Sequence, residues 1–247
     1  MKTKEGSIEC NRRTFVYEEF IFSYESDTDD KILLDNFIAV GNQLAKAVNP
    51  TLARDASRRR KYHTVLCNCV AGVIAEYCWR YRLKLQAERS NAKISVESRI
   101  FQSVDKHVDI SIAYANGSSR TVEVRSSFPY TGLTNAVCRV FDIIGWYVNP
   151  VKTKEIRKDY YVRTLFPFHS EKLWERLKGK YFSAFLTGGA TRKLLEESPF
   201  SRDKEFIPYD DIDSMLSSQR GTYRVIEPII NAYDTAKITQ HILKGIG

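Results

Sequence analysis

Two acidic residues and one arginine, on two neighbouring extended segments, are the residues of this chain best suited to chemistry. Asp109 lies in the segment VDISIAY, and Glu123 and Arg125 lie in TVEVRSS. The dipeptide Asn-Gly between the two segments is typical of a β-hairpin. Carboxylates that face each other on paired strands repel, so a positive side chain or a bound cation must compensate them. The pattern therefore predicts either an ion-pair network around Arg125 or a metal site.

The register of this hairpin decides whether the two carboxylates meet. A three-residue loop that ends with Gly117 in the left-handed region sets Asp109 directly opposite Glu123. A two-residue loop would shift the pairing by one residue and split the apolar residues of the strands between the two faces. We therefore expect the three-residue loop. It also puts Arg125 and Ser127 on the same face as Glu123, because side chains alternate along a strand.

Glu76 is a candidate third member of this site. It lies in the apolar middle of a long helix expected from about Ser57 to Leu85. A buried carboxylate without a partner costs several kcal/mol or becomes protonated. The helix precedes the sheet and should pack on it, so Glu76 would approach Asp109 and Glu123, and three carboxylates suit Mg²⁺. The alternative is an ion pair between Glu76 and Arg80, one helical turn later.

The elements that must position these residues follow from hydrophobic periodicity. Helices are expected over 29–48, 57–85 and 131–147, and extended segments over 94–104, 108–114, 120–128 and 159–166. Short helices with turns near 188–189 should follow. This order indicates an α/β fold, a mixed β-sheet flanked by helices. We expect a single domain over 1–247, with a core of about 57–166, an N-terminal helical extension (1–56) and a mostly helical C-terminal extension (167–247).

Charge is distributed unevenly along the chain. It has 38 Lys+Arg against 30 Asp+Glu, a net charge of +8. Residues 51–87 carry eight basic and two acidic residues. Basic blocks of this kind commonly contact nucleic acid, although a solvated helix face is the alternative. The candidates for contacts with nucleic acid are Arg54, Arg58, Arg59, Arg60, Lys61 and Ser127.

Taken in order, these features resemble the restriction-endonuclease-like PD-(D/E)XK nuclease superfamily. The resemblance rests on Glu76 in a helix, Asp109 in VDISI, and Glu123 and Arg125 in VEVRSS, followed by a helix and a strand. It covers roughly 57–166 and implies that Asp109 and Glu123 bind the metal while Glu76 supports the site. Arg125 stands where the superfamily usually has Lys, and Val108 stands where it often has Pro.

The resemblance implies a Mg²⁺-dependent endonuclease that hydrolyses DNA, with Mn²⁺ as a substitute and a homodimer as one arrangement for cutting both strands. The rival interpretation is a DNA-binding or regulatory protein that keeps the nuclease fold without turnover, which Arg125 favours. A third is an interaction protein whose carboxylates only pair with arginines. We expect no membrane span, and the five cysteines suit reduced thiols in the cytoplasm.

Overall fold

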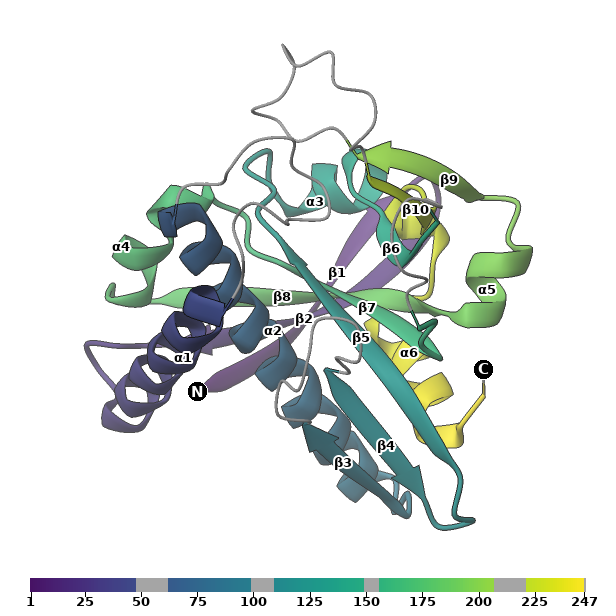
Figure 1. Cartoon of the computed structure of the whole chain (residues 1–247), viewed down its shortest axis with the longest axis horizontal. Coiled ribbons are helices and arrows are strands. Elements are labelled where there is room, and N and C mark those ends of the chain that lie inside the picture. Colours follow the sequence, from purple (N-terminus) through teal and green to yellow (C-terminus); the bar gives the residue numbers. More distant parts are fainter. Residues whose placement is uncertain (48–61, 99–108, 149–155, 207–220, 247) are drawn as a thin grey trace.

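A seven-stranded mixed sheet forms the centre of the molecule (Figure 1). The structure is a computed structural model that describes residues 1–47, 62–98, 109–148, 156–206 and 221–246. The strand order in the sheet is β1-β2-β8-β7-β5-β4-β3. Only β5 and β7 pair in parallel, and the other five neighbours are antiparallel. The sheet is built from β1 (Lys2–Cys10), β2 (Arg13–Phe22), β3 (Ile94–Ser98), β4 (Ile110–Tyr114), β5 (Ser119–Ser127), β7 (Tyr160–Leu165) and β8 (Phe182–Thr191).

A smaller sheet, in the order β6-β10-β9, lies apart from the long helices (Figure 1). Its strands are β6 (Ile143–Tyr147), β9 (Ser201–Phe206) and β10 (Gly221–Ile226). The helices are α1 (Thr28–Ala47), α2 (Tyr62–Arg89), α3 (Leu133–Asn135), α4 (Leu173–Leu177), α5 (Arg192–Glu197) and α6 (Thr235–Lys244). Four of the seven strands of the large sheet (β3, β4, β5 and β7) come from the expected core of about 57–166.

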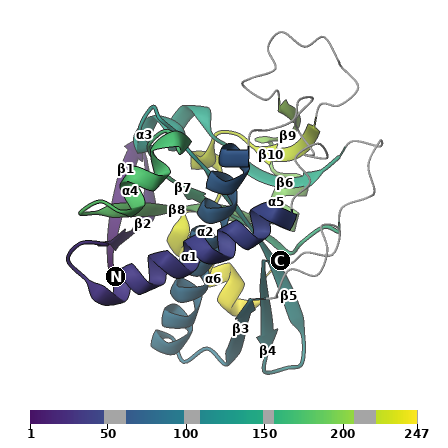
Figure 2. The ribbon, with the colours of Figure 1, turned by 60° about the vertical axis from the view of Figure 1, so that its left-hand side comes forward.

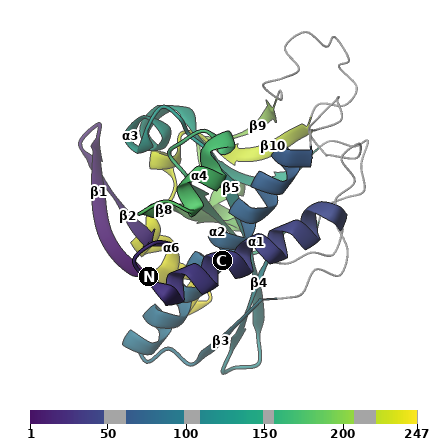
Figure 3. The same cartoon turned by 90° about the vertical axis from the view of Figure 1, so that its left-hand side faces the viewer.

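The two faces of the large sheet are covered by different layers. On one face, Val122 and Ile110 share a core with Cys78 and Leu83 of α2 and with Ile238 of α6. The helix α1 packs outside α2, and the two helices cross in Figures 2 and 3. The other face forms a second core with the region around β6 and β10. Because side chains alternate along β5, its polar residues Glu123, Arg125 and Ser127 belong to this second side.

The predicted hairpin register is confirmed. Ile110 pairs with Val122, and Gly117 has a φ of +80° that L side chains rarely adopt. The Tyr114 amide donates to the Ser118 carbonyl at 2.9 Å and closes the three-residue loop. The prediction of the long helix is also borne out by α2 over the described residues, which continues to Arg89. The chemistry-bearing strands therefore lie as the sequence pattern predicts.

The expected helix over 131–147 is wrong. Only α3 and a short π-helix, η1 (Ala136–Val140), form there, and the chain then enters β6. Ile143, Trp146 and Tyr147 belong to the β-branched and aromatic types that suit a strand. Their partner is β10, which is about eighty residues away along the sequence, so local spacing could not reveal the pairing.

The prediction of helical N- and C-terminal extensions is also wrong, because both segments contribute strands. The N-terminal segment begins with the β1–β2 hairpin before α1, and the C-terminal segment supplies β8, β9 and β10. The glycines at 188–189 lie inside β8 rather than in a turn between helices. Gly188 has a φ of +81°, and a Cβ there would lie 2.1 Å from the Tyr233 carbonyl oxygen. Thr191 caps α5, with its hydroxyl accepting from the Leu194 amide at 3.1 Å.

Candidate functional site

Asp109 lies at the start of β4, where the described pairing with β5 begins. Its Oδ2 accepts a hydrogen bond from the backbone amide of Val124 at 2.6 Å. Asp109 immediately precedes the first paired residue of β4, Ile110, and its side chain accepts a backbone hydrogen bond from the facing strand β5. This bond fixes the Asp109 carboxylate beside the backbone that connects Glu123 to Arg125. Two of the three predicted carboxylates are therefore carried by neighbouring stretches of adjacent strands.

Glu123 and Arg125 form an ion pair along β5. Arg125 Nη2 lies 3.1 Å from Glu123 Oε1, with 25% and 12% of the two side chains exposed. The Arg125 guanidinium also lies over the ring of Tyr223 in β10, with Cζ 5.8 Å from the ring centroid. A planar guanidinium held by a carboxylate and an aromatic ring has a restricted orientation. Arg125 therefore belongs to the same half-buried site as Glu123.

Glu76 lies on the other side of the sheet. It belongs to α2, which packs on the face that carries Val122, whereas Glu123 points to the opposite face. Its Oε1 is 3.9 Å from Arg80 Nη1, the ion pair considered as the alternative from the sequence. Throughout the described ranges, no three His, Cys, Asp or Glu side chains are grouped closely enough to hold a metal ion. The structure thus does not bring Glu76 to the pair of carboxylates.

Arg163 is a member of this face that the sequence analysis missed. It pairs with Arg125 across the parallel strands β5 and β7, and only 3% of it is exposed. Its Nη2 donates to the Ser127 hydroxyl at 2.7 Å, whereas its buried Nε has no hydrogen-bond partner. Burial lowers the pKa of Arg163 to about 10, the attraction of Asp142 opposes this, and repulsion from Arg125 adds to it. A second cationic group therefore lies beside Arg125.

Asp142, the acid whose charge acts on Arg163, forms its ion pair with a lysine instead. Asp142 Oδ2 lies 2.8 Å from Lys204 Nζ, which also contacts Glu227 at 2.8 Å. Burial raises the pKa of Asp142, and the hydrogen bond and charge of Lys204 act in the opposite direction. No carboxylate in the described part of the chain lies within 4.0 Å of the Arg163 guanidinium. A buried guanidinium without an ion pair is costly, and the ring of Phe141, 5.9 Å from Arg163 Cζ, offsets only part of this cost. A buried group with a shifted pKa is a candidate member of a functional site.

Ser127 is the predicted nucleic-acid contact that the structure places in this site. Its hydroxyl accepts from Arg163, so its own hydrogen remains available for donation. The only sequence signal for Arg163 was its place in the strand DYYVRTLF, where a charged residue interrupts an apolar run. The basic candidates Arg54, Arg58, Arg59, Arg60 and Lys61 lie outside the described residues.

This arrangement fits a divalent cation that binds few protein ligands. Mg²⁺ is commonly held by one or two carboxylates and completes its shell with waters and substrate phosphates. Asp109 and Glu123 would supply the oxygen donors for such a cation. Arg125, Ser127 and Arg163 carry positive charge and hydrogen-bond donors on the same face. Carboxylate oxygens suit a hard cation such as Mg²⁺ better than a soft metal. The neighbouring guanidinium groups suit a phosphate ester better than a neutral ligand.

Comparison with known proteins shows similarity to an archaeal protein but to no family. No family model matches the chain, and no solved structure matches it. A protein of Methanocaldococcus jannaschii, named "Uncharacterized protein MJECS01", is 27% identical over 218 residues, which cover 77% of this chain and 74% of that protein. Among the described helices, none has the length and apolar character needed to cross a membrane. The chain is thus similar over most of its length to a protein whose name states no activity.

Proposed function

We propose that this protein is a Mg²⁺-dependent nuclease that hydrolyses phosphodiester bonds of DNA, with Asp109 and Glu123 as metal ligands. The observation that carries the proposal is the hydrogen bond of 2.6 Å that Asp109 Oδ2 accepts from the Val124 amide. Val124 lies between Glu123 and Arg125, so this bond holds the Asp109 carboxylate next to both residues. The order β3-β4-β5-β7, with β5 and β7 parallel, further supports it. This strand order supports the resemblance to the PD-(D/E)XK superfamily, although α3, η1 and β6 stand in place of the helix expected before the last strand.

Each side chain of the site has a distinct task in this proposal. A bound Mg²⁺ would supply an activated water and stabilise charge on the phosphate. Arg125 holds the phosphate, because a guanidinium stays charged and presents several donors but cannot act as a base. Ser127 donates its hydroxyl hydrogen to a phosphate oxygen while it accepts from Arg163. Arg163, which is paired with Arg125 on the neighbouring strand, adds positive potential to the site. Its hydrogen bond to the Ser127 hydroxyl orients that side chain.

A DNA-binding protein without turnover is the second candidate function. The observation that favours it is the ion pair of 3.1 Å between Arg125 and Glu123, in which an arginine replaces the usual lysine. An arginine that neutralises a metal ligand would preserve the fold and the phosphate contacts while it weakens metal binding. Such a protein would bind DNA with the same dependence on salt but leave it intact.

DNA affinity should fall steeply as salt concentration rises. Each phosphate neutralised by Lys or Arg releases condensed counterions, so the slope of log K against log salt reports the number of such phosphates. Changing Arg58 and Arg59 to Glu should weaken binding. The magnitude of the slope should fall by about one for each phosphate that the variant no longer neutralises. Fluorescence anisotropy of a labelled duplex between dilute and physiological salt checks it. An affinity that does not change with salt would contradict a nucleic-acid partner.

Arg163→Met should weaken DNA binding without loss of stability. The long-range attraction of unit charges about 10 Å apart, at an effective dielectric of about 20, is about 1.7 kcal/mol, so affinity should fall about 15-fold. Replacing a buried charge by an apolar side chain is often neutral or stabilising, so the melting temperature should stay the same or rise. Arg89→Met, at the exposed end of α2, is the control for net charge. A large fall in melting temperature with unchanged affinity would assign Arg163 a structural role.

The proposed activity is tested by incubating the full-length protein with supercoiled plasmid, short duplexes and RNA. Conversion of the plasmid to nicked or linear DNA in Mg²⁺ or Mn²⁺, and none in EDTA, is the expected result. Salt-sensitive binding with no cleavage in any metal would favour the second candidate. Absence of both binding and cleavage would contradict both functions.

A further inference from the structure

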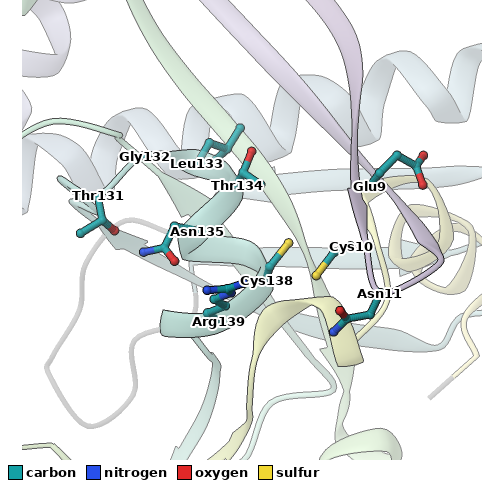
Figure 4. A pocket seen from close by; sticks show the side chains of 10 residues that line it. All are labelled: Glu9, Cys10, Asn11, Thr131, Gly132, Leu133, Thr134, Asn135, Cys138 and Arg139. Carbon is teal, nitrogen blue, oxygen red and sulfur yellow. The ribbon is translucent and has the colours of Figure 1, made fainter.

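Two cysteines from distant segments meet at the wall of a pocket away from the candidate nuclease site. Cys10 is the last residue of β1, and Cys138 is the central residue of η1. Both line a pocket of about 560 Å³ that lies between the end of the β1–β2 hairpin and the segment from Thr131 to Arg139. Figure 4 shows the two sulfur atoms side by side in this pocket.

The two thiols lie close enough for Cys10 to influence Cys138, and they differ in accessibility. Burial raises the pKa of Cys138 to about 11, and a hydrogen bond and charge interaction with Cys10 add to the effect, while Arg139 opposes it. Cys138 is 8% exposed, whereas Cys10 is half-buried and accessible from the pocket. A small oxidant that enters the pocket therefore meets Cys10 first, and Cys138 lies directly behind it.

The backbone holds both cysteines in defined positions. Cys10 pairs with Arg13 across a two-residue turn, in which Asn11 and Arg12 both have positive φ values, as in a type I′ hairpin. Cys138 lies in a single-turn π-helix, a conformation that is rare in proteins and frequent at functional sites.

The remaining cysteines are not arranged in this way. Cys67, Cys69 and Cys78 all belong to α2, and Cys67 contacts His63 Nε2 at 3.6 Å. Residues two apart on a helix point to different sides, so Cys67 and Cys69 do not face each other. Cys78 is fully buried. In the described structure, Cys10 and Cys138 are therefore the two cysteines that line one pocket with their sulfur atoms side by side.

We propose that Cys10 and Cys138 form a redox-active dithiol that closes to a disulfide when a peroxide enters the pocket. The Cys10 thiolate attacks one oxygen of the peroxide, the O–O bond breaks, and a sulfenic acid and water form after proton transfer. The Cys138 sulfur then attacks the sulfenic sulfur as its thiol gives up its proton to the leaving oxygen, and the S–O bond breaks with release of a second water. Overall, two thiols and one hydrogen peroxide give one disulfide and two waters.

The disulfide would tie the β1–β2 hairpin to η1. This link joins the edge of the large sheet to the segment that leads into β6, and β6 pairs with β10, whose Tyr223 lies under Arg125. A cross-link between residues so far apart in sequence restricts the unfolded chain strongly. The oxidised protein should therefore melt about 5 °C or more above the reduced one. The inference does not depend on the proposed nuclease activity.

The test is oxidation of the reduced full-length protein with a small excess of hydrogen peroxide, followed by alkylation and peptide mass spectrometry. The expected product has lost about 2 Da, contains a cross-linked peptide pair with Cys10 and Cys138, and returns to two alkylated thiols after dithiothreitol. Cys10→Ser and Cys138→Ser should abolish the cross-link. The matched control Cys69→Ser, which changes a half-buried cysteine of α2, should keep it.

Three results would overturn the inference. These are full alkylation of both thiols after peroxide, a sulfinic acid at Cys10 with no cross-link, and a cross-link that involves a cysteine of α2. Cys10 is half-buried at the end of a strand, so Cys10→Ser should fold even where Cys138→Ser does not. The melting temperature of the wild type and of Cys10→Ser, each measured with and without peroxide, gives an independent readout. Only the wild type should shift.

Discussion

Asp109→Asn is expected to lower the rate of Mg²⁺-dependent DNA cleavage about 1000-fold, because losing a metal ligand removes several kcal/mol of transition-state stabilisation. The melting temperature should not fall. Asparagine keeps an oxygen that can accept the hydrogen bond from the Val124 amide, which Asp109 Oδ2 accepts at 2.6 Å. Loss of the negative charge also relieves repulsion from Glu123. Single-turnover rates and melting temperatures of the two proteins check both parts.

Two further variants make this comparison specific. Asp109→Ala removes the charge and also the hydrogen-bond acceptor of the Val124 amide. It should therefore lose activity, and its free energy of unfolding should fall by about 1 kcal/mol. Glu76→Gln is the matched control, since Glu76 lies on the α2 side of the sheet beside Arg80, and most of the cleavage rate should remain. If Asp109→Asn lowers stability as much as Asp109→Ala does, the Asp109 carboxylate has a structural role.

Arg125→Ala is expected to lower the cleavage rate by about 100-fold, because one preorganised donor that stabilises developing charge has an effect of this size. Arg125→Lys keeps the charge and restores the residue usual in the superfamily, so it should retain part of the activity or exceed the wild type. Both variants lose the planar contact with Tyr223, and a small loss of stability is expected in each.

The opposite outcome would assign Arg125 a different task. If Arg125 serves only as the counter-ion of Glu123, its removal should lower stability, more for Ala than for Lys, and leave cleavage unchanged. Equal single-turnover rates for the wild type and Arg125→Ala would remove Arg125 from the site. The comparison therefore separates a phosphate-holding arginine from a structural one.

The parts of the fold predicted correctly are those set by short-range pattern. The helix α1, the helix α2 and the β4–β5 hairpin follow from periodicity and from the turn chemistry of Gly117. The failures concern strands whose partners are distant in sequence. For β6 the partner is β10, and for β8 the neighbours are β2 and β7. Such pairings depend on tertiary contacts, which local propensity does not encode.

The candidate site shows the same division. Asp109 lies beside the backbone between Glu123 and Arg125, as predicted, because hairpin register is a local property. Glu76 was misjudged because a half-buried acid can also be satisfied within its own helix, as its contact with Arg80 shows. Arg163 was missed because its neighbour Arg125 is reached through the parallel pairing of β5 and β7, with β6 and η1 between them along the chain. No spacing rule predicts which residue a parallel strand places opposite another.

The central claim is that Asp109 and Glu123 together bind the divalent cation. It is tested most directly by titrating Mn²⁺ into the protein, with and without a short DNA duplex, and counting bound ions by electron paramagnetic resonance. We expect the wild type to bind Mn²⁺, Mg²⁺ to displace it and DNA to strengthen the binding. Asp109→Asn and Glu123→Gln should each lose this binding, whereas Glu76→Gln should keep it. Mn²⁺ binding of equal strength in the wild type and Asp109→Asn, or no binding by the wild type even with DNA, would contradict the account.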